Sequence, residues 1–221
     1  MTHKITLLDR VQLTHDTHHY VFTKPDGYAF KPGQATDLAI DRDGWRDEQR
    51  PFTFTSAPEA AALSFVIKSY SDHDGVTKAL SDLAPGQTVL IGDAWGAIDD
   101  KGPGVFIAGG AGITPFLGIL KDRAREAKLD GSHLIFANEA PEDIILQPFW
   151  EGRPDLKTTF VVGKNAGPAH REGQIDAALL DDVVDDWEGR FYLCGPPKME
   201  ESVAELLAAR GVSGGRLIRE E

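Results

Sequence analysis

A glycine-rich turn near the middle of the chain has the residue types of a phosphate-binding site. The segment from 104 to 116 reads GVFIAGGAGITPF, in which a short apolar run leads into closely spaced glycines and then into Thr114 and Pro115. Glycines let a backbone turn sharply and approach a pyrophosphate closely, and the free amides at a helix start attract its charge. Thr114 is expected to cap that helix and Pro115 to occupy its first position. The turn therefore predicts a dinucleotide phosphate site.

The spacing of this turn departs from the common dinucleotide fingerprint GxGxxG. It reads GxGxxP, with Pro115 where the third glycine would stand. The other motifs of the chain must therefore decide which kind of dinucleotide site this is.

A second candidate site begins at Arg50, which heads the segment RPFTFTS. In isolation, the alternation of phenylalanine and threonine favours an ordinary half-buried strand. An arginine held in place can, however, make two charge-assisted hydrogen bonds to a phosphate. Further along, Gly75, Val76 and Thr77 open a short helix and offer free amides and a hydroxyl to another phosphate.

Composition excludes several classes of protein. The 221 residues carry 23 basic and 35 acidic side chains, a net charge of -12, and no basic arm suited to nucleic acid. Cys194 is the only cysteine, so neither an intrachain disulfide nor a four-cysteine cluster is expected, which fits a reducing cytoplasm. No apolar stretch indicates export or membrane insertion. His15, His18 and His19 lack the spacing of a metal site, so no metal is expected.

The first part of the chain, residues 1–98, reads as short strands separated by turn signals such as Pro25-Asp26-Gly27 and Ala84-Pro85-Gly86. Regularly spaced short strands predict a small antiparallel β-barrel. The expected strands are 5–13, 19–23, 36–40, 52–56, 63–68 and 88–92, with one helix at 76–83.

The second part, residues 104–221, alternates strands with helices across short loops, which predicts a parallel, doubly wound sheet. The expected strands are 104–108, 133–137, 158–163 and 190–194, and the expected helices are 115–128, 142–150, 174–180 and 197–210. Residues 99–103 are the expected boundary between the two parts. His170 is expected in a loop, and residues 217–221 are expected to form a frayed tail.

Five motifs in a fixed order give the chain a family resemblance. They are PGQ at 32–34, the strand headed by Arg50, GVTKAL at 75–80, GGAGITP at 109–115 and CGPP at 194–197. From about His19 to Ala208 the chain resembles the ferredoxin-NADP reductase superfamily, in which GxGxxP is the usual form of the turn. The resemblance implies an N-terminal six-stranded antiparallel β-barrel that binds flavin and a C-terminal α/β doubly wound parallel sheet that binds a nicotinamide cofactor.

The same resemblance implies flavin contacts in the first domain. Arg50 would bind flavin phosphate, and Phe52, where the family usually has a tyrosine, would lie against the isoalloxazine ring. Thr53 would bring its hydroxyl to flavin N5, the atom that receives hydride. The resemblance implies that Ile67 and Lys68 present backbone groups to the pyrimidine edge of the flavin ring. It implies that Gly75, Val76 and Thr77 hold the pyrophosphate. FAD is the expected flavin and FMN the alternative.

For the nicotinamide side, the resemblance implies that Cys194 lies near the hydride-donating carbon and shapes its pocket without acting as a nucleophile. Thr53 and Cys194 are therefore the expected catalytic residues. Glu139 follows the second strand of its domain, where a carboxylate accepts a hydrogen bond from a ribose 2′-hydroxyl and repels a 2′-phosphate. NADH is favoured on this ground, although Lys164 and Arg171 argue for NADPH. The expected contacts are Gly110, Gly112, Thr114, Pro115, Asn138, Glu139, Cys194, Gly195 and Pro196.

The implied function is transfer of hydride from NADH or NADPH to bound FAD, followed by release of electrons to a separate acceptor such as a ferredoxin, a flavodoxin or a haem protein. Three alternatives stay open. They are a reductase of free flavins, a non-catalytic electron-transfer subunit of a larger complex, and a plain NAD-dependent dehydrogenase without flavin. The end of the chain offers no aromatic residue to cover a flavin, which implies freer access for the nicotinamide.

Overall fold

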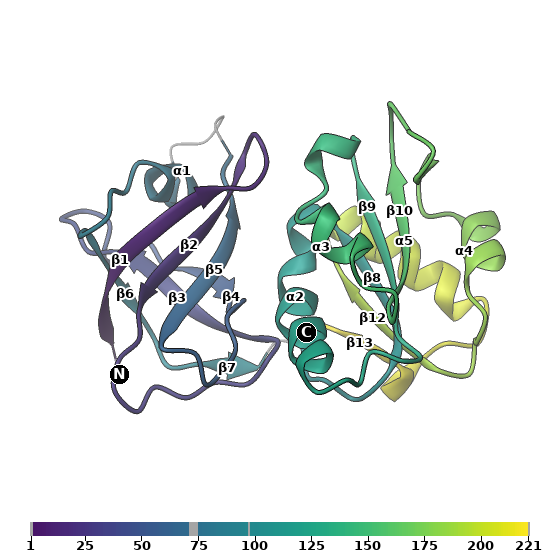
Figure 1. Ribbon diagram of the computed structural model, residues 1–221, viewed down its shortest axis with the longest axis horizontal. Helices are drawn as coiled ribbons and strands as arrows, with labels where there is room; N and C mark the ends of the chain where they lie inside the picture. Colours follow the sequence, from purple (N-terminus) through teal and green to yellow (C-terminus); the bar gives the residue numbers. More distant parts are fainter. Residues whose placement is uncertain (1, 71–74, 97, 221) are drawn as a thin grey trace.

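The computed structural model describes residues 2–70, 75–96 and 98–220 and has two domains side by side (Figure 1). The N-terminal domain is the predicted antiparallel β-barrel, with its six main strands in the order β4-β3-β6-β1-β2-β5. A bridge between Phe54 and Phe65 brings the end of β4 against β5, which nearly closes the barrel. The strands are β1 (His3–Gln12), β2 (Thr17–Thr23), β3 (Gln34–Ile40), β4 (Arg50–Thr53), β5 (Ala62–Lys68) and β6 (Thr88–Ile91).

Aromatic rings fill the barrel because alternate residues of each strand point inward. Phe54 stacks on Phe30 with ring centroids 4.3 Å apart and also contacts Phe65, and all three side chains are buried. Two short elements complete the domain: helix α1 (Val76–Ser81), whose Val76 enters this core, and strand β7 (Trp95–Gly96), which pairs with β3.

The C-terminal domain is the predicted parallel sheet with helices on both faces (Figure 1). Six strands pair in the order β11-β10-β9-β8-β12-β13, every pair parallel. The strands are β8 (Gly104–Gly109), β9 (His133–Asn138), β10 (Lys157–Val162), β11 (His170–Glu172), β12 (Arg190–Cys194) and β13 (Leu217–Arg219). The helices are α2 (Ile113–Arg125), α3 (Gln147–Glu151), α4 (Ala177–Val183) and α5 (Pro197–Ala208).

Several expected boundaries in this domain were wrong. Helix α2 begins at Ile113 with Gly112 as its N-cap and has no side-chain cap, so Thr114 is not the cap and Pro115 is the third helical residue. Pro115 still lies within the first turn, whose amides have no helical acceptor, so it removes no hydrogen bond. Helix α4 is three residues later than expected because Asp176 caps it, accepting a hydrogen bond from the Leu179 amide at 2.8 Å.

The helix expected at 142–150 is also broken. A 3₁₀ turn at Pro141–Asp143 is separated from α3 by Leu146, which has φ of 58°, in the left-handed region. The fully buried indole of Trp150 donates to the Ile145 carbonyl at 2.8 Å, which holds this interruption in place.

Two segments expected to be irregular are edge strands. His170 begins β11, which pairs with β10, and Leu217 begins β13, which pairs with β12. The tail expected from 217 onward is therefore part of the sheet as far as Arg219. This pairing carries Glu220 to the edge of the parallel sheet, next to the end of β12.

The segment that joins the two domains is fixed to the C-terminal domain. Tyr192 of β12 accepts a hydrogen bond from the Lys101 amide at 2.9 Å and donates to the Gly102 carbonyl at 2.8 Å. Arg123 of α2, a buried side chain, donates to Asp100 at 3.0 Å. These bonds hold residues 100–102 against β12 and α2.

Candidate functional site

A cavity of about 430 Å³ lies between the two domains and is lined from both sides; we call it the interdomain cavity. Most of the residues expected at the site meet here. From the barrel these are Phe52, Thr53, Ile67, Lys68 and Thr77, and from the parallel sheet they are Gly112, Thr114, Cys194, Gly195 and Pro196.

The barrel wall is formed by β4 and β5, which present neighbouring residues to the same space. Thr53 ends β4 opposite Ala35 of β3 and is 8% exposed, while Phe52 is only partly buried, and both residues line the cavity. A threonine and a phenylalanine from the end of one strand thus line the same space. That arrangement suits a flat, partly polar ring system.

Part of the expected flavin set lies outside this wall. Arg50 is exposed and donates to the Gln49 carbonyl at 2.6 Å and to Glu48 at 3.5 Å, and it does not line the cavity. Gly75 is the N-cap of α1, and Val76 is 2% exposed in the barrel core. Of that helix start, only Thr77 reaches the cavity.

On the other wall, the glycine turn and the end of β12 lie in direct contact. A Cβ placed on Gly112 would be 2.3 Å from the carbonyl oxygen of Cys194, and one placed on Gly109 would be 2.3 Å from the Met199 sulfur. Gly110 has φ of 51°, in the left-handed region. The turn therefore needs glycine for close backbone approach and for its conformation.

The Cys194 thiol is a buried, protonated group. The side chain is 8% exposed, and burial, followed by the charges of Glu220 and Glu200, raises the pKa of Cys194 far above its usual range. Because the thiolate is the nucleophilic form, a raised pKa disfavours this thiol as a nucleophile. The next amide, Gly195, donates to Glu200 at 2.7 Å.

Several lining residues lie outside the expected set, among them two aromatic residues and one glutamate. Tyr70 and Trp95 are 48% and 40% exposed and lie on the cavity wall, and Glu220 reaches it from the end of β13. Partial desolvation and the nearby Glu200 raise the pKa of Glu220. A tryptophan in a Gly-rich stretch directly after β6 was a usable signal for Trp95. No local pattern pointed to Glu220, because its position depends on the pairing of β13 with β12.

A second cavity of about 470 Å³ adjoins the first at the carboxyl ends of the parallel strands; we call it the sheet-end cavity. It shares Lys68, Gly109 and Pro196 with the interdomain cavity and adds the remaining expected residues Gly110, Asn138 and Glu139. Ligands of open parallel sheets bind at this end of the strands. Of the expected nicotinamide set, Pro115 alone lines neither cavity.

Two features of the sheet-end cavity bear on its ligand. The side-chain nitrogen of Asn138 is buried without a hydrogen-bond partner among the described residues. Glu139 accepts from Lys164 at 2.5 Å, and this ammonium lowers the pKa of Glu139. An unused donor and a paired carboxylate therefore stand at the end of β9.

Within the described part of the chain, no three His, Cys, Asp or Glu side chains are grouped so that they could hold a metal ion. Residues 2–70, 75–96 and 98–220 also contain no helix with the length and apolarity needed to cross a bilayer.

Comparison with known proteins gives the C-terminal domain a family match. Residues 106–205 match the model of the oxidoreductase NAD-binding domain. The chain is 27% identical over 203 residues to the reductase component of propane 2-monooxygenase from Rhodococcus jostii, covering 85% of this chain and 54% of that protein. It is 26% identical to the ferredoxin--NAD(P)(+) reductase component of the naphthalene 1,2-dioxygenase/salicylate 5-hydroxylase systems of a Ralstonia species, covering 96% and 66%. The chain thus spans about half to two-thirds of these relatives.

Among solved structures, the fold is similar over nearly the full length to a ferredoxin NADP+ reductase from Neisseria gonorrhoeae with bound FAD and NADP. The TM-score is 0.86 at 22% identity, with 97% of this chain and 94% of that chain covered. The likeness confirms the predicted two-domain architecture.

Proposed function

We propose that this chain, which has the two-domain fold of the ferredoxin reductase-like flavoproteins and an oxidoreductase NAD-binding domain at residues 106–205, is a flavin-dependent NAD(P)H oxidoreductase. The observation that carries the proposal is the interdomain cavity. Its barrel wall holds Thr53 and Phe52, and its opposite wall holds Cys194 and the glycine turn. Two ring systems that exchange hydride must meet in one enclosed space, and this cavity provides it.

The residues present fit a flavin and a nicotinamide dinucleotide. Phe52 offers a ring face, Thr53 offers a hydroxyl, and a Cβ at Gly112 or Gly109 would collide with neighbouring atoms and distort the turn. When bound, the flavin supplies the conversion between two-electron and one-electron transfer. FAD is proposed over FMN because Thr77 of α1 lines the cavity and would offer its hydroxyl to a diphosphate. Arg50, whose side chain lies outside the cavity, is proposed as a further phosphate ligand.

The chain's own residues would bind the flavin and nicotinamide rings, orient them and shield them from water. Thr53 would donate a hydrogen bond from its hydroxyl to flavin N5, and Phe52 would pack against the ring. Cys194, kept as a thiol by its burial, fills the pocket beside the nicotinamide without adding a charge. The remaining flavin contacts are proposed for Ile67, Lys68, Gly75, Val76 and Thr77.

The sheet-end cavity is proposed to hold the rest of the nicotinamide dinucleotide. The amides near Gly110 and Gly112, at the start of α2, would hold the pyrophosphate, with Thr114 and Pro115 in that first turn. Gly195 and Pro196 bound the nicotinamide end. The unpartnered nitrogen of Asn138 is a donor for the adenosine half.

NADH is proposed as the preferred donor. Glu139 stands at the end of β9, where it can accept a hydrogen bond from a ribose hydroxyl. Lys164 pairs with Glu139 at 2.5 Å, which places a carboxylate beside this cation and disfavours a 2′-phosphate there.

The electron acceptor is proposed to be a separate protein, such as a ferredoxin, a flavodoxin or a haem protein. The chain holds one cysteine and so cannot supply a four-cysteine cluster itself. The relatives from Rhodococcus jostii and the Ralstonia species are named as reductase components of larger systems, which supports this role. A cytoplasmic location is proposed with it.

A stopped-flow experiment tests the proposal. Protein that has passed through gel filtration is expected to stay yellow and to bleach on mixing with NADH, faster than with an equal concentration of NADPH. A colourless protein that reduces added flavin would replace the proposal with a free-flavin reductase. A flavin-free protein that oxidises NADH with an organic substrate would indicate a plain dehydrogenase.

A further inference from the structure

A separate cavity of about 290 Å³ lies where α2 meets the barrel; we call it the hydroxyl-lined cavity. Helix α2 lies on the side of the C-terminal domain that is next to the barrel (Figure 1). The barrel contributes His19, Thr55, Ser56, Ala57, Ala60 and Ser64 to its lining, and α2 contributes Gly118, Lys121, Asp122 and Arg125. The cavity shares no lining residue with the interdomain or sheet-end cavity.

The contact between α2 and the barrel at Gly118 explains why this space is distinct. A Cβ on Gly118 would lie 2.9 Å from the Phe54 carbonyl oxygen, so helix and barrel backbone touch at this point. Thr114, which lines the interdomain cavity, is one helical turn before Gly118, and Lys121 is about one turn after it. The hydroxyl-lined cavity therefore opens on the far side of this contact from Thr114.

Lys121 has a charge without a counter-ion among the described residues. Its side chain is partly buried, and the contact formed by its ammonium is with the ring face of Phe149, at 5.6 Å from the centroid. Burial lowers the pKa of Lys121. An ammonium removed from water without a carboxylate is unfavourable, and an anion in the adjoining cavity would offset that cost.

The nearby carboxylates are engaged elsewhere. Asp122 accepts from Arg125 at 2.6 Å, and Arg125 also pairs with Glu59 of the barrel, so these three charges form their own network across the interface. Of the two cationic side chains that line this cavity, Arg125 is therefore paired, and Lys121 has no counter-ion among the described residues.

The barrel side presents groups that favour an anion. His19 and Lys121 line the cavity from opposite domains, and burial together with the Lys121 charge lowers the pKa of His19, against an opposing effect of Asp9. The Ser56 hydroxyl oxygen accepts from the Ser64 amide at 3.1 Å, which leaves its hydrogen available to donate. The Thr55 and Ser64 hydroxyls are 3.0 Å apart and share one hydrogen bond, so together they retain one further donor.

We propose that the hydroxyl-lined cavity binds a small oxyanion of the phosphate class, held between Lys121 of α2 and the Ser56, Thr55 and Ser64 hydroxyls of the barrel. Bound there, the anion bridges the two domains. The proposal goes beyond the oxidoreductase function and does not depend on it, because none of these residues lines the proposed cofactor cavities.

Thermal unfolding with inorganic phosphate as the probe tests this directly. The melting temperature of the protein as purified is expected to rise with phosphate concentration above that in sodium chloride of equal ionic strength, since a ligand of the folded state stabilises it. Lys121→Met is expected to abolish the phosphate-specific rise. The control Lys128→Met removes an exposed lysine that pairs with Glu126, and the rise should persist. Equal rises in the Lys121→Met variant and the parent would overturn the proposal.

A second measurement does not depend on any variant. The pKa of His19, followed by the NMR signal of its ring proton, is expected to rise when phosphate binds, because a nearby anion stabilises the imidazolium. Glycerol 3-phosphate used in place of phosphate distinguishes the source. A response to both probes means that the cavity accepts a phosphoryl group of a larger molecule, and a response to phosphate alone means a free ion. No shift of His19 with either probe would refute the site.

Discussion

The α-carbon of Gly112 lies so close to the backbone of Cys194 that a Cβ on it would be 2.3 Å from the Cys194 carbonyl oxygen and 2.5 Å from its carbonyl carbon. The glycine turn and the CGPP segment, far apart in the sequence, are thus one surface. Anything that displaces one of them displaces the other.

Gly112→Ala is therefore expected to push Cys194 out of position. The added methyl meets backbone atoms that cannot rotate away, so we expect a loss of about 2 kcal/mol in the free energy of unfolding, typical of overpacking. Binding of NADH should weaken as well. Gly215→Ala is the matched control, because a Cβ there meets nothing within 4 Å. Urea unfolding and NADH titration of both variants measure the difference, and similar values for the two would contradict the account.

Thr53→Ala tests the hydroxyl on the barrel wall. If Thr53 donates to flavin N5, its loss should slow flavin reduction by NADH about tenfold, the size of one hydrogen bond, with flavin still bound. Thr53→Ser keeps a hydroxyl at the same place and should stay near the parent rate. Stopped-flow bleaching at saturating NADH gives these rates. Unchanged reduction in the alanine variant would remove Thr53 from the mechanism.

Glu139→Arg is expected to shift preference from NADH toward NADPH. The change removes the carboxylate and also frees Lys164, which now pairs with Glu139 at 2.5 Å, so two cations would face a 2′-phosphate. The free energy of one charged hydrogen bond corresponds to a change of roughly ten- to a hundredfold in kcat/KM. Lys164→Gln should leave the NADH preference in place. The measurement is the ratio of kcat/KM for NADH to kcat/KM for NADPH. If Glu139→Arg leaves this ratio unchanged, Glu139 does not determine the preference between the two donors.

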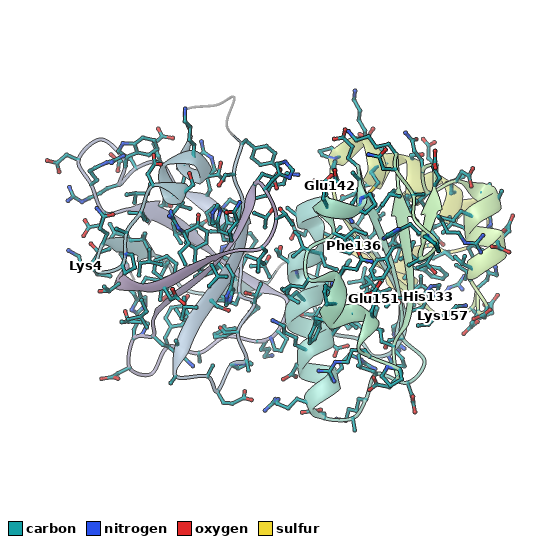
Figure 2. The ribbon with its side chains drawn as sticks, turned by 45° about the horizontal axis from the view of Figure 1, so that its top comes forward. Lys4, His133, Phe136, Glu142, Glu151 and Lys157 are labelled. Carbon is teal, nitrogen blue, oxygen red and sulfur yellow. The ribbon has the colours of Figure 1, made fainter. Side chains whose placement is uncertain are left out.

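His133 is expected to make the fold sensitive to acid. His133 is the first residue of β9, and its side chain is 6% exposed. Its Nε2 atom lies 2.9 Å from the Thr159 hydroxyl oxygen. Lys157 of β10 is paired with His133 in the sheet (Figure 2). Burial, helped by the Lys157 charge, lowers the pKa of His133 to about 4. In the unfolded chain the value is roughly 6.5, so the unfolded state binds the proton first and stability falls as the pH drops from about 6.5 to about 4.

The variant His133→Gln should lack this part of the pH dependence, which amounts to about 3 kcal/mol over that interval. His15→Gln, an exposed histidine of the barrel, serves as the control and should follow the parent. Urea unfolding at pH 7 and at pH 4.5 gives the comparison. Parallel losses in His133→Gln and the parent would show that His133 is not the group responsible.

The architecture could be predicted because its signals are local. Periodicity and turn residues define each main strand, and the GxGxxP and CGPP motifs are short enough to read directly. The edge strands at His170 and Leu217 could not be predicted in this way, since three residues become a strand only through a neighbour already in place. The left-handed Leu146 likewise depends on where the Trp150 indole finds its acceptor.

The site was predictable to the extent that its residues belong to motifs. Thr53, Cys194 and the glycines lie together as expected, whereas Trp95, Tyr70 and Glu220 reach the same cavity through tertiary placement alone. The side chain of Arg50 lies outside the cavity and donates a hydrogen bond to the neighbouring Gln49. Its contact with flavin phosphate therefore stays a prediction.

The hydrogen bonds of Tyr192 and Arg123 to residues 100–102 bear on how the chain can be divided. A fragment that began at Gly104 would retain every strand of the parallel sheet yet leave the Tyr192 hydroxyl without its backbone partners and the buried Arg123 without Asp100. The connecting segment is therefore structurally part of the C-terminal domain. A stable half-molecule would have to include it.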